Sequence, residues 1–124
     1  MWNNLILNTD SYKMSHFLQY PSGTAYINSY IASRGVSDAS LAGEAPEIVN
    51  LGLQIFIMEY LQKNITIDHI EEAQYIAQLH GVPFNRDGWM KILKKHSGFL
   101  PIVIEGLPEG TPVPVGTTQY QVRN

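Results

Sequence analysis

Apolar residues recur at helical spacing in the middle of the chain. Within 67–77 they follow one another at intervals of three or four positions, as Ile67, Ile70, Ala73 and Ala77. Such spacing places them on one face of a helix. Thr66 can accept a hydrogen bond from the free backbone N–H groups of the first turn, and Gly81 suits the position after the last turn. The pattern predicts a helix from Thr66 to about His80.

A second amphipathic segment follows a short break. Asn85 can cap it, Lys94 and Lys95 fall in its last turn, and Gly98 can end it. Cations near the carboxyl end of a helix oppose the negative end of its dipole. The inward positions are those of Trp89, Ile92 and Leu93. We therefore predict a helix from Asn85 to about Gly98.

Residues 47–63 are apolar almost all round a helical projection. Ile48, Leu51, Ile55 and Met58 mark one face, and further apolar residues fill much of the rest. A helix without a polar face is normally buried, yet a domain of this size has little core in which to bury one completely. The pattern predicts a buried helix from Glu47 to Lys63 and indicates that more protein packs against it.

Period-two alternation predicts the first strand. Ala25 to Arg34 alternates between small or aliphatic positions and mostly larger or polar ones. Ile102 to Glu105 and Thr117 to Val122 are shorter candidates, separated by a rigid turn region at 108–110 and 112–116. Residues 35–46 read as a mobile loop of small residues. The elements together predict an α+β fold, in which three main helices pack on a small, mostly antiparallel sheet within a single domain, 1–124.

Composition narrows the class of protein. The chain has 124 residues, 44% of them hydrophobic, with a net charge of −3 and no cysteine. It therefore has no disulfide framework or thiolate chemistry. Its basic residues form no cluster beyond Lys91, Lys94 and Lys95, so we expect no nucleic-acid partner. No segment approaches the ~20 apolar residues of a membrane helix, and the start lacks a signal-peptide pattern. We expect a cytoplasmic protein that does not bind membranes.

The segment from Thr9 to Pro21 carries the densest set of polar and aromatic groups. It combines a carboxylate, two tyrosines, a lysine and a histidine. Thr9 or Asp10 can cap a helix there, and Pro21 marks its end because the residue before a proline avoids helical geometry. Groups of this kind are costly to bury without partners. We therefore expect the segment to lie on a surface that meets another molecule.

Three stretches carry a resemblance to a known family. They are Asp10 to Lys13 with His16 and Tyr20-Pro21, then Val82 to Trp89, and then Gly98 to Ile102 continued by Leu107 to Gly116. In their order and spacing they resemble the N-terminal part of the nicotinamide phosphoribosyltransferase family, over nearly the whole chain. The resemblance implies transfer of phosphoribosyl from phosphoribosyl pyrophosphate to nicotinamide, which gives nicotinamide mononucleotide and pyrophosphate in NAD salvage.

The resemblance also implies how the activity is divided along the family's chain. Its α/β barrel, which supplies most charged groups of the active site, follows the region matched here. The resemblance implies that the enzyme works as a homodimer with a site shared across subunits, and that Mg²⁺ accompanies phosphoribosyl pyrophosphate. On this hypothesis residues 1–124 are an N-terminal domain cut off before the barrel. We expect this domain to have no catalytic residue, metal or cofactor of its own and to be inactive alone.

Asp10, Tyr12 and Arg34 are the candidate substrate-binding residues. From pattern alone, Asp10 is more simply a cap, Tyr12 an aromatic at the core edge, and Arg34 an exposed arginine that closes a strand. The resemblance implies that the tyrosine stacks on the nicotinamide ring of the other subunit's site, with the aspartate beside it. It implies that Arg34 contacts the phosphates of phosphoribosyl pyrophosphate there. Lys13 reads as a solvated side chain.

The histidines carry weaker signals. His16 lacks the neighbours of a catalytic base and reads as a structural residue. His69, His80 and His96 fit no zinc spacing.

Two alternatives remain open. One is a nicotinate phosphoribosyltransferase domain, since the choice between amide and acid is made largely in the barrel. The other is a stand-alone, non-catalytic binding or dimerisation module, for which the apolar segment 47–63 would be the docking face.

Overall fold

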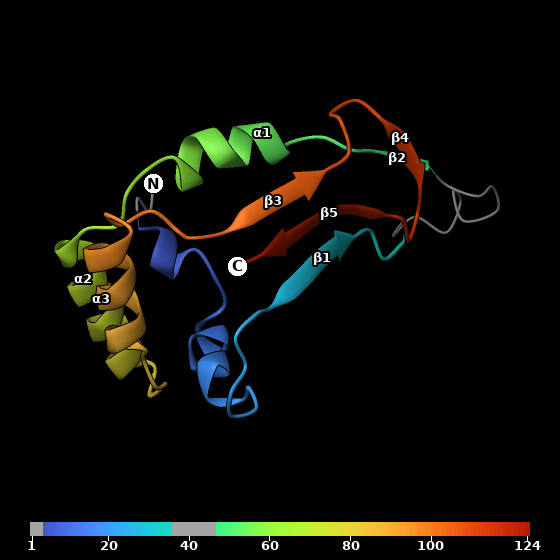
Figure 1. The fold of residues 1–124 in the computed structure, drawn as a ribbon. Helices are drawn as coiled ribbons and strands as arrows, with labels where there is room; N and C mark the ends of the chain where they lie inside the picture. The colour runs from blue at the N-terminus through green and yellow to red at the C-terminus, as the bar shows by residue number, and fades with distance from the viewer. Residues whose placement is uncertain (1–3, 36–46) are drawn as a thin grey trace. The chain divides into compact units, whose positions relative to one another are not determined.

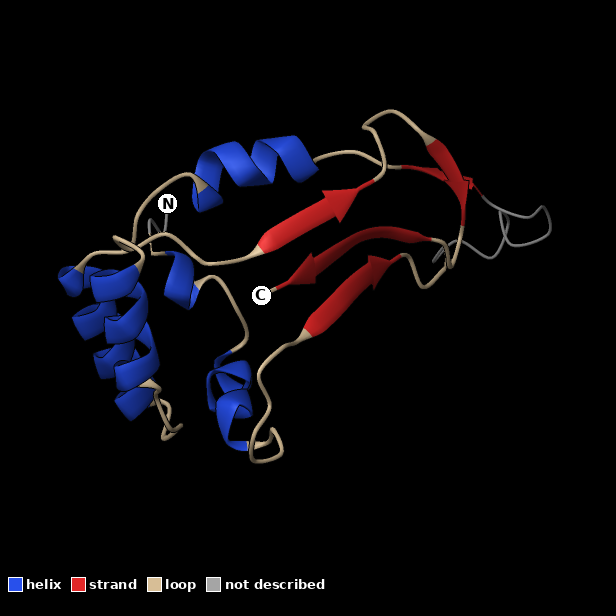
Figure 2. Ribbon diagram, in the orientation of Figure 1, coloured by secondary structure: helices blue, strands red, loops and turns tan. Residues whose placement is uncertain are grey.

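The computed structural model describes residues 4–35 and 47–124 and has the predicted α+β composition (Figures 1 and 2). It divides into two compact units. The helical unit comprises the described residues of Met1–Thr24 and Ile57–Pro101, and the sheet unit those of Ala25–Phe56 and Ile102–Asn124. Within the described residues every strand pairing is antiparallel, where a mostly antiparallel sheet was predicted. Of the loop predicted at 35–46, only Gly35 lies within the described residues.

The helical unit contains two regular helices and three short ones. They are the 3-10 helices η1 (Leu5–Leu7) and η2 (Ser11–Leu18), the π-helical turn η3 (Ile57–Leu61), and the α-helices α2 (Ile67–Leu79) and α3 (Arg86–Lys95). The predictions for α2 and α3 are confirmed to within a few residues at each end. Their periodic apolar faces and their caps both lay within the local sequence, which is why the pattern located them.

Capping fixes both helix starts. The Thr66 side chain accepts a hydrogen bond from the His69 backbone N–H at 3.3 Å, and His69 Nδ1 accepts one from the Thr66 N–H at 3.2 Å. This reciprocal pair is a capping box in which histidine takes the place of the usual Glu or Gln. Asn85 caps α3 by accepting from the Gly88 N–H at 3.0 Å. At the far end of α2, Gly81 takes a φ of 67°, which stops the helix.

The core of the helical unit lies on the inner face of α2. Ile6, Ile65, Ile70 and Ala73 are buried, and Leu7, Phe84, Trp89, Met90, Leu93 and Leu100 pack around them. Burial of this apolar surface is the main force that holds α2, α3 and η1 together. The chain closes this core where Gly98 meets Ile65, whose N–H donates to the Gly98 carbonyl oxygen at 2.9 Å.

The sheet unit contains two small antiparallel sheets. Strands β1 (Asn28–Ala32), β5 (Thr118–Arg123) and β3 (Val103–Gly106) lie side by side in that order, with a register shift between Ile31 and Ala32 (Figure 1). Strands β2 (Glu47–Val49) and β4 (Pro112–Pro114) form the second sheet. The strands predicted around 25–34, 102–105 and 117–122 are confirmed with shifted ends.

The helix predicted from Glu47 to Lys63 is wrong in its first part. Glu47–Val49 is a strand, and the helix begins only with α1 (Leu53–Phe56), which runs into η3. The physical reason is Gly52, whose φ of 105° lies outside right-handed helical geometry. Ile55 and Met58 are 62% and 64% exposed, so the helical part is not buried within the described chain, and packing of further protein against it stays a prediction.

The turn region predicted at 112–116 contains a strand instead, and a buried asparagine fixes it. Val113 pairs with Ile48, although Pro112 and Pro114 on either side of it lack N–H donors. Asn50 is 0% exposed, and its Nδ2 donates to the Leu107 carbonyl oxygen at 2.7 Å. Its backbone also bonds with Thr111 and Gly110. These bonds tie β2 to the β3–β4 connection, a long-range pairing that local pattern does not signal.

Candidate functional site

The candidate site in the helical unit is the exposed surface of η2. The segment predicted as a helix from Thr9 to Pro21 is a shorter 3-10 helix, Ser11–Leu18, and it buries none of its residues. Its geometry is set locally, because the Lys13 N–H donates to the Asp10 carbonyl oxygen and the Gln19 N–H to that of His16, both at 2.9 Å. The predicted surface position of this segment is confirmed within the described chain.

Asp10 occupies the N-cap position, but its side chain makes no capping hydrogen bond. Of the two predicted cap candidates, Thr9 and Asp10, the structure thus places Asp10 at the N-cap position without a capping bond from its side chain. Its Oδ2 instead pairs with Lys13 Nζ at 2.9 Å, and the two side chains remain 62% and 47% exposed. The spacing of three residues allows this pair on a helical turn. The carboxylate is thus held by a cation on the surface and keeps its second oxygen, Oδ1, for other donors.

Tyr12 stands beside this ion pair. Its side chain is 58% exposed, and Lys13 Nζ lies 5.8 Å from the centre of its ring, within the range of a cation–π contact. The His16 ring lies 5.6 Å away, tilted by 59°, an arrangement that aromatic pairs favour. The structure therefore brings Asp10, Tyr12, Lys13 and His16 into one exposed group, which we call the η2 cluster.

Electrostatics inside the η2 cluster act on Lys13. The hydrogen bond from Lys13 to Asp10, and then the charge of that carboxylate, raise the pKa of Lys13 above its ordinary value of 10.5. Lys13 is therefore fully charged at neutral pH. Sequence reasoning treated this side chain as merely solvated, although the spacing of Asp10 and Lys13 was a signal for the pair.

A groove runs beside the cluster within the helical unit. It has a volume of about 390 Å³ and is lined by Leu7, Asn8, Thr9, Ser11, Met14, Ile76 and His80. Its walls come from the η1–η2 segment and the last turns of α2. Met14 and Ser11 line this groove from η2, so the helix that carries the η2 cluster also forms part of a hollow in the surface.

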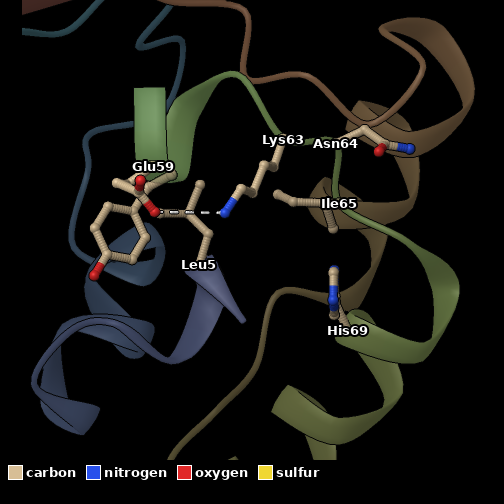
Figure 3. A pocket seen from close by; sticks show the side chains of 7 residues that line it. Leu5, Glu59, Lys63, Asn64, Ile65 and His69 are labelled. Atoms are coloured by element: carbon tan, nitrogen blue, oxygen red, sulfur yellow. Dashed lines mark ion pairs between the residues drawn. The ribbon is translucent and has the colours of Figure 1, made fainter. Parts of the chain in front are cut away.

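A second pocket is too small for a substrate. It lies among η1, η3 and the start of α2, and Leu5, Ile65 and His69 are among the residues that line it (Figure 3). Its volume of about 20 Å³ admits at most one water molecule. The Glu59–Lys63 ion pair drawn beside it, at 3.7 Å, spans one helical turn on the surface.

Arg34 belongs to the sheet unit, where it follows the end of β1 and is exposed. Within residues 4–35 and 47–124, its guanidinium group makes no hydrogen bond or ion pair. The structure thus brings Asp10 and Tyr12 together at η2. The third predicted site residue, Arg34, lies in the sheet unit and has no ion-pair partner among the described residues.

The described residues contain no group of three or more His, Asp or Glu side chains that could hold a metal ion. Among the same residues, no helix is long and apolar enough to cross a membrane.

Comparison with known proteins supplies the family. Residues 4–104 match the family described as "Nicotinamide phosphoribosyltransferase, N-terminal domain", a region that contains Asp10, Tyr12 and Arg34. A nicotinamide phosphoribosyltransferase of Xanthomonas campestris pv. campestris (strain 8004) is 42% identical over 112 residues, or 90% of this chain. The chain spans only 22% of the length of that relative. These matches confirm the resemblance seen in the sequence, and the chain belongs to the nicotinamide phosphoribosyltransferase N-terminal domain family.

Proposed function

We propose that this chain is the N-terminal domain of an enzyme that transfers phosphoribosyl from phosphoribosyl pyrophosphate to nicotinamide. The products are nicotinamide mononucleotide and pyrophosphate, and the reaction serves NAD salvage in the cytoplasm. The family match and the relative's name support this assignment. In the reaction a bond forms between the pyridine nitrogen and ribose C1 while the bond from C1 to the pyrophosphate oxygen breaks.

The observation that carries the proposal is the exposure of Asp10 and Tyr12 side by side. Tyr12 offers an open ring on which a flat pyridine can stack. The Asp10 carboxylate accepts hydrogen bonds. It makes no capping bond at the helix end and is not buried in the core. A carboxamide N–H is a matching donor. The pair therefore serves as a clamp for the nicotinamide ring, in which Tyr12 supplies the surface and Asp10 the hydrogen bond.

Arg34 serves as the phosphate contact on this proposal. A guanidinium group matches phosphate oxygens with two parallel hydrogen bonds, and no described residue neutralises Arg34. We place all three residues as contributors to the site of a second subunit in a homodimer. Mg²⁺ would enter with phosphoribosyl pyrophosphate, whose phosphate oxygens are the ligands that it prefers.

This division of labour makes the domain a binding element. The η2 cluster is solvent-exposed, so it has no dry, enclosed setting in which developing charge could be stabilised strongly. We therefore propose that the isolated chain is inactive. Formation of nicotinamide mononucleotide by the isolated 124-residue chain would contradict that part of the proposal.

The test uses the full-length protein that carries this domain and measures nicotinamide mononucleotide formation. Tyr12→Ala should raise the KM for nicotinamide by about tenfold, the order expected for a lost stacking contact. Asp10→Ala should raise it by about 10- to 100-fold, and Asp10→Asn by less because an amide oxygen still accepts. Arg34→Ala should raise the KM for phosphoribosyl pyrophosphate instead.

Tyr75→Ala is the matched control, because Tyr75 is 60% exposed on α2 and close to Tyr12 in exposure. It should leave both KM values unchanged. Unchanged kinetics in the Tyr12 and Asp10 variants would overturn the clamp. Faster turnover of nicotinate than of nicotinamide by the unaltered protein would overturn the substrate assignment.

A further inference from the structure

Three contacts on η2 converge on the two residues of the proposed clamp, and two of them come from Lys13. Lys13 Nζ lies 2.9 Å from Asp10 Oδ2 and 5.8 Å from the ring centre of Tyr12. The third contact is the tilted packing of His16 on Tyr12. A single ammonium group thus links the hydrogen-bonding residue to the stacking residue.

The link matters because nothing else in the described chain fixes the Asp10 side chain. Asp10 has an extended backbone, with φ −67° and ψ 133°, and it forgoes the capping bond that would hold its carboxylate against the helix end. Lys13 engages Oδ2 alone. Oδ1 is left to accept hydrogen bonds from a ligand.

The Tyr12 ring is restrained in the same way. Lys13 Nζ lies 5.8 Å and the centre of the His16 ring 5.6 Å from the centre of its ring, while 58% of the residue stays exposed. Each contact is weak alone, because exposed ion pairs and ring contacts contribute little to stability. Their effect on binding differs, since a side chain that is already oriented does not lose rotamer freedom when the ligand arrives.

We infer that Lys13 is a positioning residue, which holds Asp10 and Tyr12 in the arrangement that receives the carboxamide and ring of nicotinamide. This inference rests on the proposed function. Lys13 does not touch the substrate. It acts through the two residues that do, and His16 supports the ring from the next turn.

A consequence for specificity follows from charge. The Lys13 ammonium partly offsets the Asp10 carboxylate, which would otherwise repel the carboxylate of nicotinate. Removal of Lys13 should therefore weaken nicotinate binding by more than nicotinamide binding. The preference for the amide, measured as the ratio of the two kcat/KM values, should rise about two- to fivefold, because a charge effect at a solvated site is modest.

The experiment compares Lys13→Gln and Lys13→Arg in the full-length protein. Lys13→Gln should raise the KM for nicotinamide about three- to tenfold, the loss expected when a binding side chain must be ordered anew. Its kcat, its KM for phosphoribosyl pyrophosphate and its unfolding midpoint should stay unchanged. Lys13→Arg, which keeps the charge, should restore most of the nicotinamide affinity.

Two comparisons isolate the mechanism. Lys63→Gln removes another exposed ion pair of the helical unit, that with Glu59, and should leave the kinetics unchanged. In the Asp10→Ala variant, adding Lys13→Gln should raise the KM for nicotinamide by a smaller factor than Lys13→Gln does alone, because the main partner of Lys13 is already gone. Full additivity of the two changes would overturn the inference.

The outcomes separate this inference from the proposed function. If Tyr12→Ala and Asp10→Ala weaken nicotinamide binding but Lys13→Gln does not, the clamp stands and the positioning role is wrong. If Lys13→Gln raises the KM for phosphoribosyl pyrophosphate instead, Lys13 contacts phosphate directly and the positioning role is again wrong. If none of these variants changes nicotinamide binding, the proposed function of η2 fails and the inference fails with it.

Discussion

Gly98 allows the sharpest test of the helical unit. Its φ of 82° lies in the left-handed region, and a Cβ at this position would lie 2.3 Å from the Ile65 carbonyl oxygen and 2.9 Å from the Ile65 nitrogen. Both atoms belong to backbone that cannot rotate away. Gly23 has a nearly identical φ of 84°, but a Cβ there would have no atom within 4 Å. Alanine at either position should therefore suffer similar backbone strain, but only alanine at position 98 should clash with a neighbour.

The expected magnitudes follow from this difference. Placing alanine at a left-handed position costs about 1–2 kcal/mol, of which about half is recovered because the unfolded chain loses freedom. Gly23→Ala should therefore lower the free energy of unfolding by about 1 kcal/mol. Gly98→Ala adds a backbone displacement comparable to overpacking, about 1–3 kcal/mol. It also disturbs the hydrogen bond from Ile65 to Gly98, worth about 1 kcal/mol. Its total loss should be about 3–5 kcal/mol.

Urea unfolding of the 124-residue chain, followed by far-ultraviolet circular dichroism, measures both losses. With a slope of about 1–1.5 kcal/mol per molar urea, the Gly98→Ala midpoint should lie about 2 M below that of Gly23→Ala. Equal midpoints for the two variants would refute the close approach of Gly98 to Ile65. They would also remove the steric reason for glycine in the stretch that follows α3.

Three further predictions concern single contacts. Asn50→Ala should lower the free energy of unfolding of the sheet unit by about 1–3 kcal/mol, because the Leu107 carbonyl oxygen loses its buried donor; urea unfolding measures the loss, and Asn50→Asp should be no better because a carboxylate cannot donate. Thr66→Ala should lower the free energy of unfolding by about 1 kcal/mol because the cap is lost. Thr66→Ser keeps the capping hydroxyl and should show nearly the original stability in thermal unfolding. The raised pKa of Lys13 means that its ion pair stabilises the folded state below pH 10.5 and that this contribution is lost as pH rises through the higher folded pKa. An NMR titration of Lys13 should therefore show a lower midpoint in Asp10→Asn than in the unaltered protein. An equal midpoint would contradict the pairing.

Local signals explain which elements the sequence could predict. α2 and α3 each combine a periodic apolar face with a capping residue inside the same short stretch, at Thr66 and Asn85. The three longer strands lie close to the segments predicted from the sequence, and antiparallel strand pairs outnumber parallel ones in proteins. These elements needed no knowledge of distant contacts, so pattern and propensity were sufficient.

The segment 47–63 shows where local reading fails. Its apolar residues fit a helix, but Ile48 pairs with Val113 in a different part of the chain. Asn50 and Gly52 lie between the strand and the helix, the first with bonds to the β3–β4 connection and the second with a φ of 105°. The strand thus depends on partners more than 50 residues away, as the separation of 57 residues between Asn50 and Leu107 illustrates. Tertiary pairing overrode the helical pattern.

The same limit applies to the candidate site. The sequence located Asp10 and Tyr12 on an exposed segment, which the structure confirms, but it also offered Asp10, beside Thr9, as a cap, and the Asp10 side chain makes no capping bond. A cap and an ion pair compete for the same carboxylate, and spacing alone favours neither, since Asp10 can reach the free N–H groups of η2 as well as Lys13. Only the backbone geometry and the 2.9 Å contact decide between them.

That decision has a functional consequence. A capping aspartate would direct its oxygens toward the helix end and accept from backbone N–H groups, which leaves little capacity for a ligand. An aspartate paired with Lys13 stays on the surface with one oxygen free, next to an open tyrosine ring. The absence of the cap is thus what would make η2 suitable for the proposed clamp. It also means that Asp10→Ala should barely change the stability of the helical unit while it weakens nicotinamide binding, a separation that a capping role would not produce.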